Sequence, residues 1–144
     1  MRTLNRENLL DILYGCAILG TGGGGSLDEG IEMIDEALAA EKEFKLTTFE
    51  EMSPEDVIGT PYACGAISPL TEEEIKKYAR LKETDESFYI LCMKQLERFL
   101  GREVSAVIST ELGGGNTATA FYVGAMTGRP IVDGDPAGRS VPAL

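Results

Sequence analysis

The sequence predicts an α/β fold, with a mostly parallel or mixed sheet and flanking helices. The clearest signal lies in residues 104–132, where an apolar β-like run, a glycine turn, a helix-like run and a second apolar run follow one another. That order is typical of a βαβ crossover, whose two strands lie parallel in one sheet. Ahead of it, segments of helical period alternate with short β-rich segments at 44–48 and 57–67.

Capping residues mark where the predicted helices begin. Asn5 opens a first helix that ends near Leu19, where a run of glycines starts, and Ser26 or Asp28 opens a second. A capping box over 71–74 opens a short polar helix over 72–81. A further helix over 86–100 follows, and its apolar spacing predicts these inward side chains: Phe88, Leu91, Leu96 and Phe99.

The composition of the chain excludes several classes of function. The chain has 144 residues and a formal charge of −11, so we expect one domain over 1–144 that avoids nucleic acid and anionic membranes. No apolar run approaches the roughly 20 residues that span a bilayer, and no secretory signal is evident, so we expect a cytoplasmic protein. Histidine is missing from the sequence, which excludes a Ser-His-Asp triad within this chain.

The cysteines are three and widely spaced, which argues against a disulfide framework or a Cys-x-x-Cys metal site. We expect Cys16 and Cys92 to be small buried apolar side chains. Cys64 follows a β-like run beside Gly65 and could line a substrate site. It could also act as a nucleophile if a cation or a helix N-terminus lowered its pKa.

Acidic and polar residues follow both strands of the predicted βαβ unit. Glu111 and Asn116 come after the first strand, and Asp133, Asp135 and Arg139 come after the second. Because ligands of open parallel sheets bind outside the carboxyl ends of the strands, we expect these residues to share one crevice.

The three carboxylates are the candidate catalytic groups. They could hold a divalent cation such as Mg²⁺ or Ca²⁺, or serve as an acid/base pair. Arg139 could orient a substrate carboxylate, and Asn116 could contact substrate. Structural alternatives remain open: Glu111 bound to backbone amides, Asn116 as a helix cap, and an Asx turn at 133–139 with an Arg–Asp bridge.

Two glycine turns complete the candidate site. Their exposed N–H groups could bind substrate anions or developing negative charge, and the glycines concerned are Gly22, Gly23, Gly24, Gly25, Gly114 and Gly115. The first turn also matches the dinucleotide pattern G-x-G-x-x-G, but that fingerprint needs a preceding strand, and residues 16–19 fit a helix better. A third reading is a turn that serves only close helix packing.

Three of these stretches, taken in order, resemble the S-methyl thiohydantoin desulfurase family, whose genes often lie near hydantoinase/oxoprolinase-type proteins. They are the glycine run over 19–25, the acidic glycine turn over 111–116, and the segment 133–139 followed by Pro142. The resemblance implies a hydrolase acting on a small cyclic hydantoin-like or thiohydantoin-like compound.

Members of that family are longer and carry a C-terminal domain. We therefore expect this chain to be an N-terminal domain, or one subunit of a split protein. Its expected partners are a small-molecule substrate and either further copies of itself or a polypeptide that completes the site. The alternative is a non-catalytic subunit or a domain that binds a small anion and completes a partner's active site.

Overall fold

The computed structural model describes residues 1–64, 69–81 and 84–141, so Gly65 and Pro142 of the sequence motifs lie outside it. Within these ranges, five strands form one sheet in the order β1-β2-β5-β4-β3. Their bounds are β1 Arg2–Leu4, β2 Phe44–Thr47, β3 Ile58–Gly59, β4 Ala106–Ile108 and β5 Ile131–Val132. Among the strand pairs of the described residues, β1–β2 alone is antiparallel. The predicted α/β class and the βαβ unit are therefore confirmed, and β1 is an edge strand that the sequence did not reveal.

In the described residues, five α-helices join the strands, together with one 3₁₀ turn. The helices are α1 Arg6–Gly20, α2 Leu27–Ala39, α3 Glu72–Tyr78, α4 Phe88–Leu100 and α5 Gly114–Thr127, and the 3₁₀ turn η1 spans Phe49–Glu51. Each predicted helix is present, although α3 is shorter than expected. The Asn5 side chain accepts a hydrogen bond from the Asn8 N–H at 2.9 Å, and the Ser26 hydroxyl accepts one from the Glu29 N–H at 3.3 Å. Both predicted caps therefore open their helices.

Residues 16–19 belong to α1, so a helix and not a strand leads into the first glycine turn. The dinucleotide fingerprint places its glycines directly after a strand, so that the phosphate meets the next helix N-terminus. The pattern match at 20–25 therefore lacks the structural context that gives it meaning.

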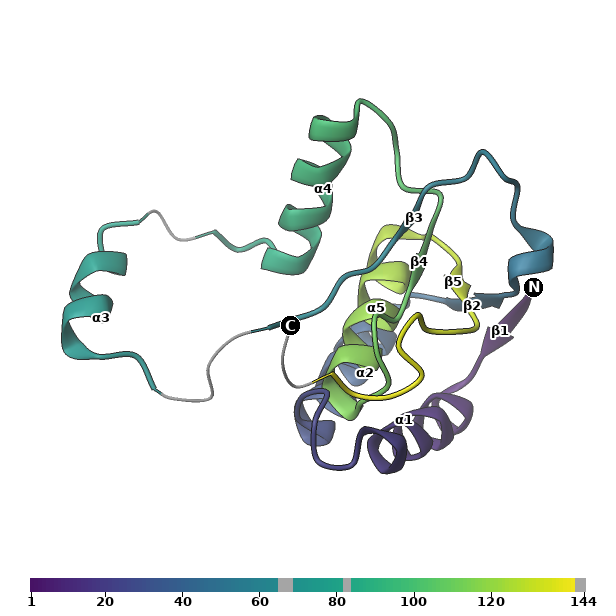
Figure 1. Ribbon diagram of the computed structural model, residues 1–144, viewed down its shortest axis with the longest axis horizontal. Helices are drawn as coiled ribbons and strands as arrows, with labels where there is room; N and C mark the ends of the chain where they lie inside the picture. The colour runs from purple at the N-terminus through teal and green to yellow at the C-terminus, as the bar shows by residue number, and fades with distance from the viewer. Residues whose placement is uncertain (65–68, 82–83, 142–144) are drawn as a thin grey trace.

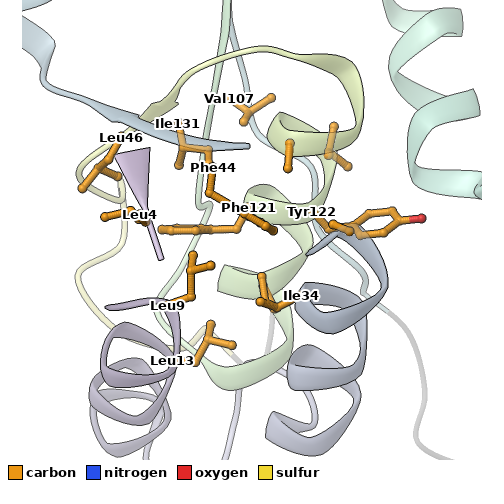
Figure 2. Packing of buried hydrophobic residues seen from close by; sticks show 14 of the residues in the cluster. Leu4, Leu9, Leu13, Ile34, Phe44, Leu46, Val107, Phe121, Tyr122 and Ile131 are labelled. Carbon is orange, nitrogen blue, oxygen red and sulfur yellow. The ribbon is translucent and has the colours of Figure 1, made fainter. Parts of the chain in front are cut away.

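Helix α5 lies between two layers, with the sheet on one side and α1 and α2 on the other (Figure 1). It is rich in small residues and is buried from Asn116 through Ala125, as expected of a helix that is covered on all sides. Figure 2 shows Phe121 pointing into the core shared by these layers. On the opposite face of the sheet, Ala106, Ile108 and Val132 form a small separate cluster with Met52 and Ile58. The two faces of the sheet are thus covered very unequally.

Helix α4 differs from its prediction. Of the four side chains expected to point inward, Phe88 is 58% exposed, Leu96 is 43% exposed and Phe99 is 87% exposed. Leu91 is only partly buried, and the helix contacts the core through Met93, with Tyr89 and Ile90 packed beside it. Cys92 is also exposed, so the expectation of a buried thiol holds for Cys16 and is wrong for Cys92. The periodicity identified the helix but not which of its apolar stripes is covered.

Candidate functional site

The carboxyl ends of β4 and β5 lie side by side. Ile108 and Val132 are register partners in this parallel pair, so the loops that follow both strands leave the same edge of the sheet. The sheet therefore brings Glu111 and Asp133 to one edge, as the βαβ signature implies. Two surface hollows of the described chain lie elsewhere: one is lined by residues 94–103 of the α4 end, and the other by residues 41–45 and 125–128.

Glu111 is buried, with 7% of its surface exposed, and both of its carboxylate oxygens accept hydrogen bonds. Oε1 accepts from the Asn116 side-chain amide at 2.7 Å, and Oε2 accepts from the backbone N–H of Val141. Asn116 in turn exchanges hydrogen bonds with the backbone of Ala63, at 3.0 and 3.3 Å. This pair therefore ties together the segment after β3, the start of α5 and the segment after β5.

The two glycine turns pack directly against each other. A Cβ on Gly113 would lie 2.3 Å from the Gly24 Cα, and one on Gly115 would lie 2.9 Å from the Gly25 Cα. The Gly24 carbonyl accepts hydrogen bonds from the N–H groups of Gly115 and Asn116, at 3.0 and 2.8 Å, and so caps α5. The Gly115 N–H, one of the glycine donors expected to serve a substrate, is thus used inside the chain, and so is the Gly23 N–H, which donates to the Gly20 carbonyl at 2.9 Å.

Other glycines of the first turn differ in what surrounds them. A Cβ on Gly22 would meet no atom within 4 Å, whereas one on Gly23 would lie 2.4 Å from the Ser140 hydroxyl. On α2, a Cβ on Gly30 would lie 2.4 Å from the Gly114 carbonyl oxygen. The glycines at this edge therefore let α1, α2 and α5 approach closely, the packing role that the sequence left open.

The loop after β5 holds its acids in a different way. The Asp135 carboxylate accepts hydrogen bonds from the N–H groups of Ala137, at 3.1 Å, and of Gly138, which is an Asx-type turn. Arg139 donates to the Ser140 carbonyl at 2.7 Å and forms no ion pair among the described residues. Asp133 is exposed and takes part in none of the ion pairs or hydrogen bonds of the described side chains.

Within residues 1–64, 69–81 and 84–141, no three His, Cys, Asp or Glu side chains are placed to hold a metal ion together. The expected convergence of Glu111, Asp133 and Asp135 on one divalent cation is therefore not formed by these residues. Glu111 points into the protein, toward Asn116 and Val141, while Asp133 is on the surface.

Cys16 on α1 comes close to the acids of the β5 loop. Burial raises the pKa of its thiol, a hydrogen bond with Thr117 opposes that shift, and the negative charges of Asp135 and Asp133 raise the pKa further. The thiol therefore stays protonated and poorly nucleophilic at neutral pH. Cys64, by contrast, is exposed next to Ala63, where Asn116 holds the backbone.

Several groups at this edge were not predicted. The Ser140 residue is 5% exposed, and its hydroxyl has no hydrogen-bond partner among the described atoms. The backbone of Ala63 and Val141 completes the Glu111–Asn116 network, and no side-chain pattern could have pointed to those amides. Cys16 could have been placed here, because the apolar face of α1 (Leu9, Leu13, Cys16, Gly20) runs straight into the first glycine turn.

Together these features define an α/β domain that gathers glycine and acid turns at the carboxyl edge of a mostly parallel sheet. Residues 7–144 match the family model described as S-Me-THD-like, N-terminal domain. The chain belongs to this family, which confirms the resemblance inferred from its motifs.

One solved structure is similar over 100% of this chain, the crystal structure of a protein from Chromobacterium violaceum that was a structural genomics target. The identity is 24%, the TM-score is 0.61, and the match covers 37% of that longer chain. At this identity the likeness shows the fold alone. No curated protein matches the chain. In the described residues, no helix combines the length and apolar character needed to cross a bilayer.

Proposed function

We propose that this chain is the N-terminal domain of a hydrolase that acts on an S-methylthiohydantoin or a related five-membered cyclic amide. The observation that carries the proposal is membership of the S-Me-THD-like family over residues 7–144. The site supports it because the carboxyl edge of the sheet presents one exposed carboxylate, Asp133, beside a network that holds three chain segments in place.

The proposed chemistry is displacement of the methylthio group by water. Asp133 accepts a proton as water adds to the ring carbon that bears the sulfur. The C–S bond then breaks and the proton held by Asp133 goes to the departing sulfur, which leaves as methanethiol. The second proton of the water moves to the ring nitrogen as the ring carbonyl forms. Glu111 and Asn116 position the loops in this scheme, and the remaining free N–H groups of the first glycine turn, with Arg139, orient the ring.

The test measures methanethiol release from S-methylthiohydantoins, together with hydrolysis of hydantoins and oxoproline. The chain is assayed alone and with any polypeptide that purifies with it. Asp133→Asn should lower kcat by about 100-fold or more, the usual contribution of a general base. Asp11→Asn, which removes an exposed carboxylate from α1, is the matched control and should leave kcat unchanged. Genuine turnover that survives Asp133→Asn would remove Asp133 from the mechanism.

The second candidate function is that of a non-catalytic domain that completes a partner's active site. It is favoured because several groups of the candidate site already form hydrogen bonds within the chain. Both oxygens of Glu111 and the N–H groups of Gly115 and Asn116 are already bonded within the chain. On this account the chain binds the cyclic compound without turning it over, and activity appears only with the partner polypeptide. That activity would then be insensitive to Asp133→Asn.

A further inference from the structure

The segment between β3 and β4 exposes an unusual amount of apolar surface. Of the fourteen large hydrophobic side chains that are exposed in the described chain, eight lie between residues 70 and 100. We call these eight the α3–α4 surface: Leu70, Ile75, Tyr78, Leu81, Phe88, Leu96, Phe99 and Leu100. Contiguous exposed apolar patches mark interaction sites, so each of these two helices is a candidate contact.

On α4 the exposed residues form one continuous stripe. Phe88, Leu96 and Phe99 follow a helical spacing, and the exposed Cys92 lies between the first two. The neighbouring stripe, through Met93, is the one that packs on the core. Helix α4 therefore has two apolar faces, and the body of the domain covers only one of them.

Helix α3 gives independent evidence that something packs here. It has seven residues, none of them buried, and Figure 1 shows it standing away from the layers of the domain. Isolated helices shorter than about 12 residues are marginal in water even with good caps, because packing supplies most helix stability. The capping box of Thr71 and Glu74 does not supply that packing.

Charge distinguishes this segment from the rest of the chain. Residues 70–103 hold seven of the 13 basic residues and eight of the 24 acidic ones, so the segment is nearly neutral in a chain of net charge −11. Two copies of such an acidic chain would repel each other over most of their surface, and this segment is where they can meet without that repulsion.

The charges are also ordered along α3. Helix α3 begins with Glu72, Glu73 and Glu74 and continues with Lys76 and Lys77. Helix α4 lacks this order, because Glu86 ahead of it is paired with Lys94 within the chain and Glu97 stands beside Arg98 in its last turns. A two-fold axis perpendicular to α3 would run this helix antiparallel to its copy, which sets its acidic start against the partner's basic end.

From this apolar, neutral and self-complementary surface we infer that α3 and α4 form the contact between two copies of this chain. The longer chain of the C. violaceum protein contains further polypeptide, and a domain of that kind is the competing occupant of the same surface. The charge order favours the second copy, because self-complementarity is required only of a surface that meets itself.

The experiment is sedimentation equilibrium of the full chain, over loading concentrations from about 1 μM to 1 mM. A concentration-dependent dimer is expected. Phe99→Glu should raise its dissociation constant about 100-fold, since it buries a charge at an apolar anchor. Ile18→Glu is the matched control, because Ile18 on α1 is 77% exposed and lies outside the surface; it should change the constant less than about 3-fold.

Charge exchange tests the antiparallel arrangement. Glu73→Lys and Lys77→Glu should each weaken the dimer about 5- to 10-fold, and the double exchange should restore it, because opposite charges face each other again. A chain that stays monomeric throughout, or a dimer that Phe99→Glu leaves intact, would overturn the inference. So would single charge variants that weaken the dimer without recovery in the double variant. None of these outcomes depends on whether the chain hydrolyses thiohydantoins.

Discussion

The loops that follow β4 and β5 leave the same edge of the sheet, yet they treat their carboxylates in opposite ways. Glu111 is buried and accepts hydrogen bonds at both oxygens, whereas Asp133 is exposed and unpaired among the described residues. A buried carboxylate must be fully bonded, because an unpaired charge in the protein interior is very costly. The comparison teaches that an acid at a strand end is not automatically a catalytic group. In this domain the acid of the β4 loop holds neighbouring segments in place, while Asp133 of the β5 loop is accessible to solvent.

Substitution of a glycine in the β4 loop should disturb the packing of this loop more than any other change. Gly113→Ala places a methyl group 2.3 Å from the Gly24 Cα, so the backbone of one turn must move away from the other. We expect a loss of about 3–5 kcal/mol in the free energy of unfolding, or failure to fold, as for severe overpacking against backbone. Urea denaturation measures the loss.

Gly15→Ala is the control for that substitution. It lies inside α1, where a Cβ meets no atom within 4 Å, so it should stabilise the chain by about 0.5–1 kcal/mol. Equal losses of unfolding free energy in the two variants would show that the contact between the glycine turns does not contribute to the stability of the chain.

Glu111→Gln tests the hydrogen-bond network itself. Glutamine can accept the bond from Asn116 or the bond from the Val141 N–H with its single oxygen, but it must turn an NH₂ group toward the other donor. We expect a loss of about 1–3 kcal/mol, the cost of an unsatisfied buried donor. Increased amide exchange at Ala63 and Val141 should accompany it, because Asn116 and Glu111 hold those segments. A variant as stable as the wild type would mean that Glu111 has no supporting role.

Within the β5 loop, substitutions of Asp135 can distinguish the role of its turn-forming oxygen from the role of its negative charge. Asp135→Asn keeps the oxygen that accepts from Ala137 and Gly138, while Asp135→Ala removes it. Only the alanine variant should lose stability, by about 0.5–1 kcal/mol. If Asp135 also acts chemically, the asparagine variant will lose activity at unchanged stability, which denaturation and turnover measured on the same samples will reveal.

The sequence predicted those parts of the molecule that depend on local signals. The caps at Asn5 and Ser26 and the strand–glycine–helix–strand order over 104–132 identified the helices, the parallel pair and its edge. The sequence left open that Glu111 binds backbone amides, but no local signal could identify the donor as the N–H of Val141, because tertiary folding brings that residue to it.

The outward face of α4 was mispredicted for a related reason. Apolar spacing shows that a stripe is to be covered, but it does not show whether the same domain or another molecule covers it. Long-range placement decided both of these differences, at Glu111 and at α4.

The smallest expected effect on stability belongs to Asp133→Asn, and it sharpens the comparison most. Asp133 is exposed and has no ion pair with another described residue, so its carboxylate contributes within about 0.5 kcal/mol to the free energy of unfolding and the variant should denature like the wild type. If Asp133 is the base of the proposed hydrolysis, kcat should fall while KM for the cyclic substrate changes little, because the carboxylate acts on water and does not hold the ring. Glu111→Gln should do the opposite. It should lower the free energy of unfolding, and it should lower kcat only indirectly, through the disturbed loops. A result in which Asp133→Asn is destabilised and Glu111→Gln is not would invert the roles of the two loops.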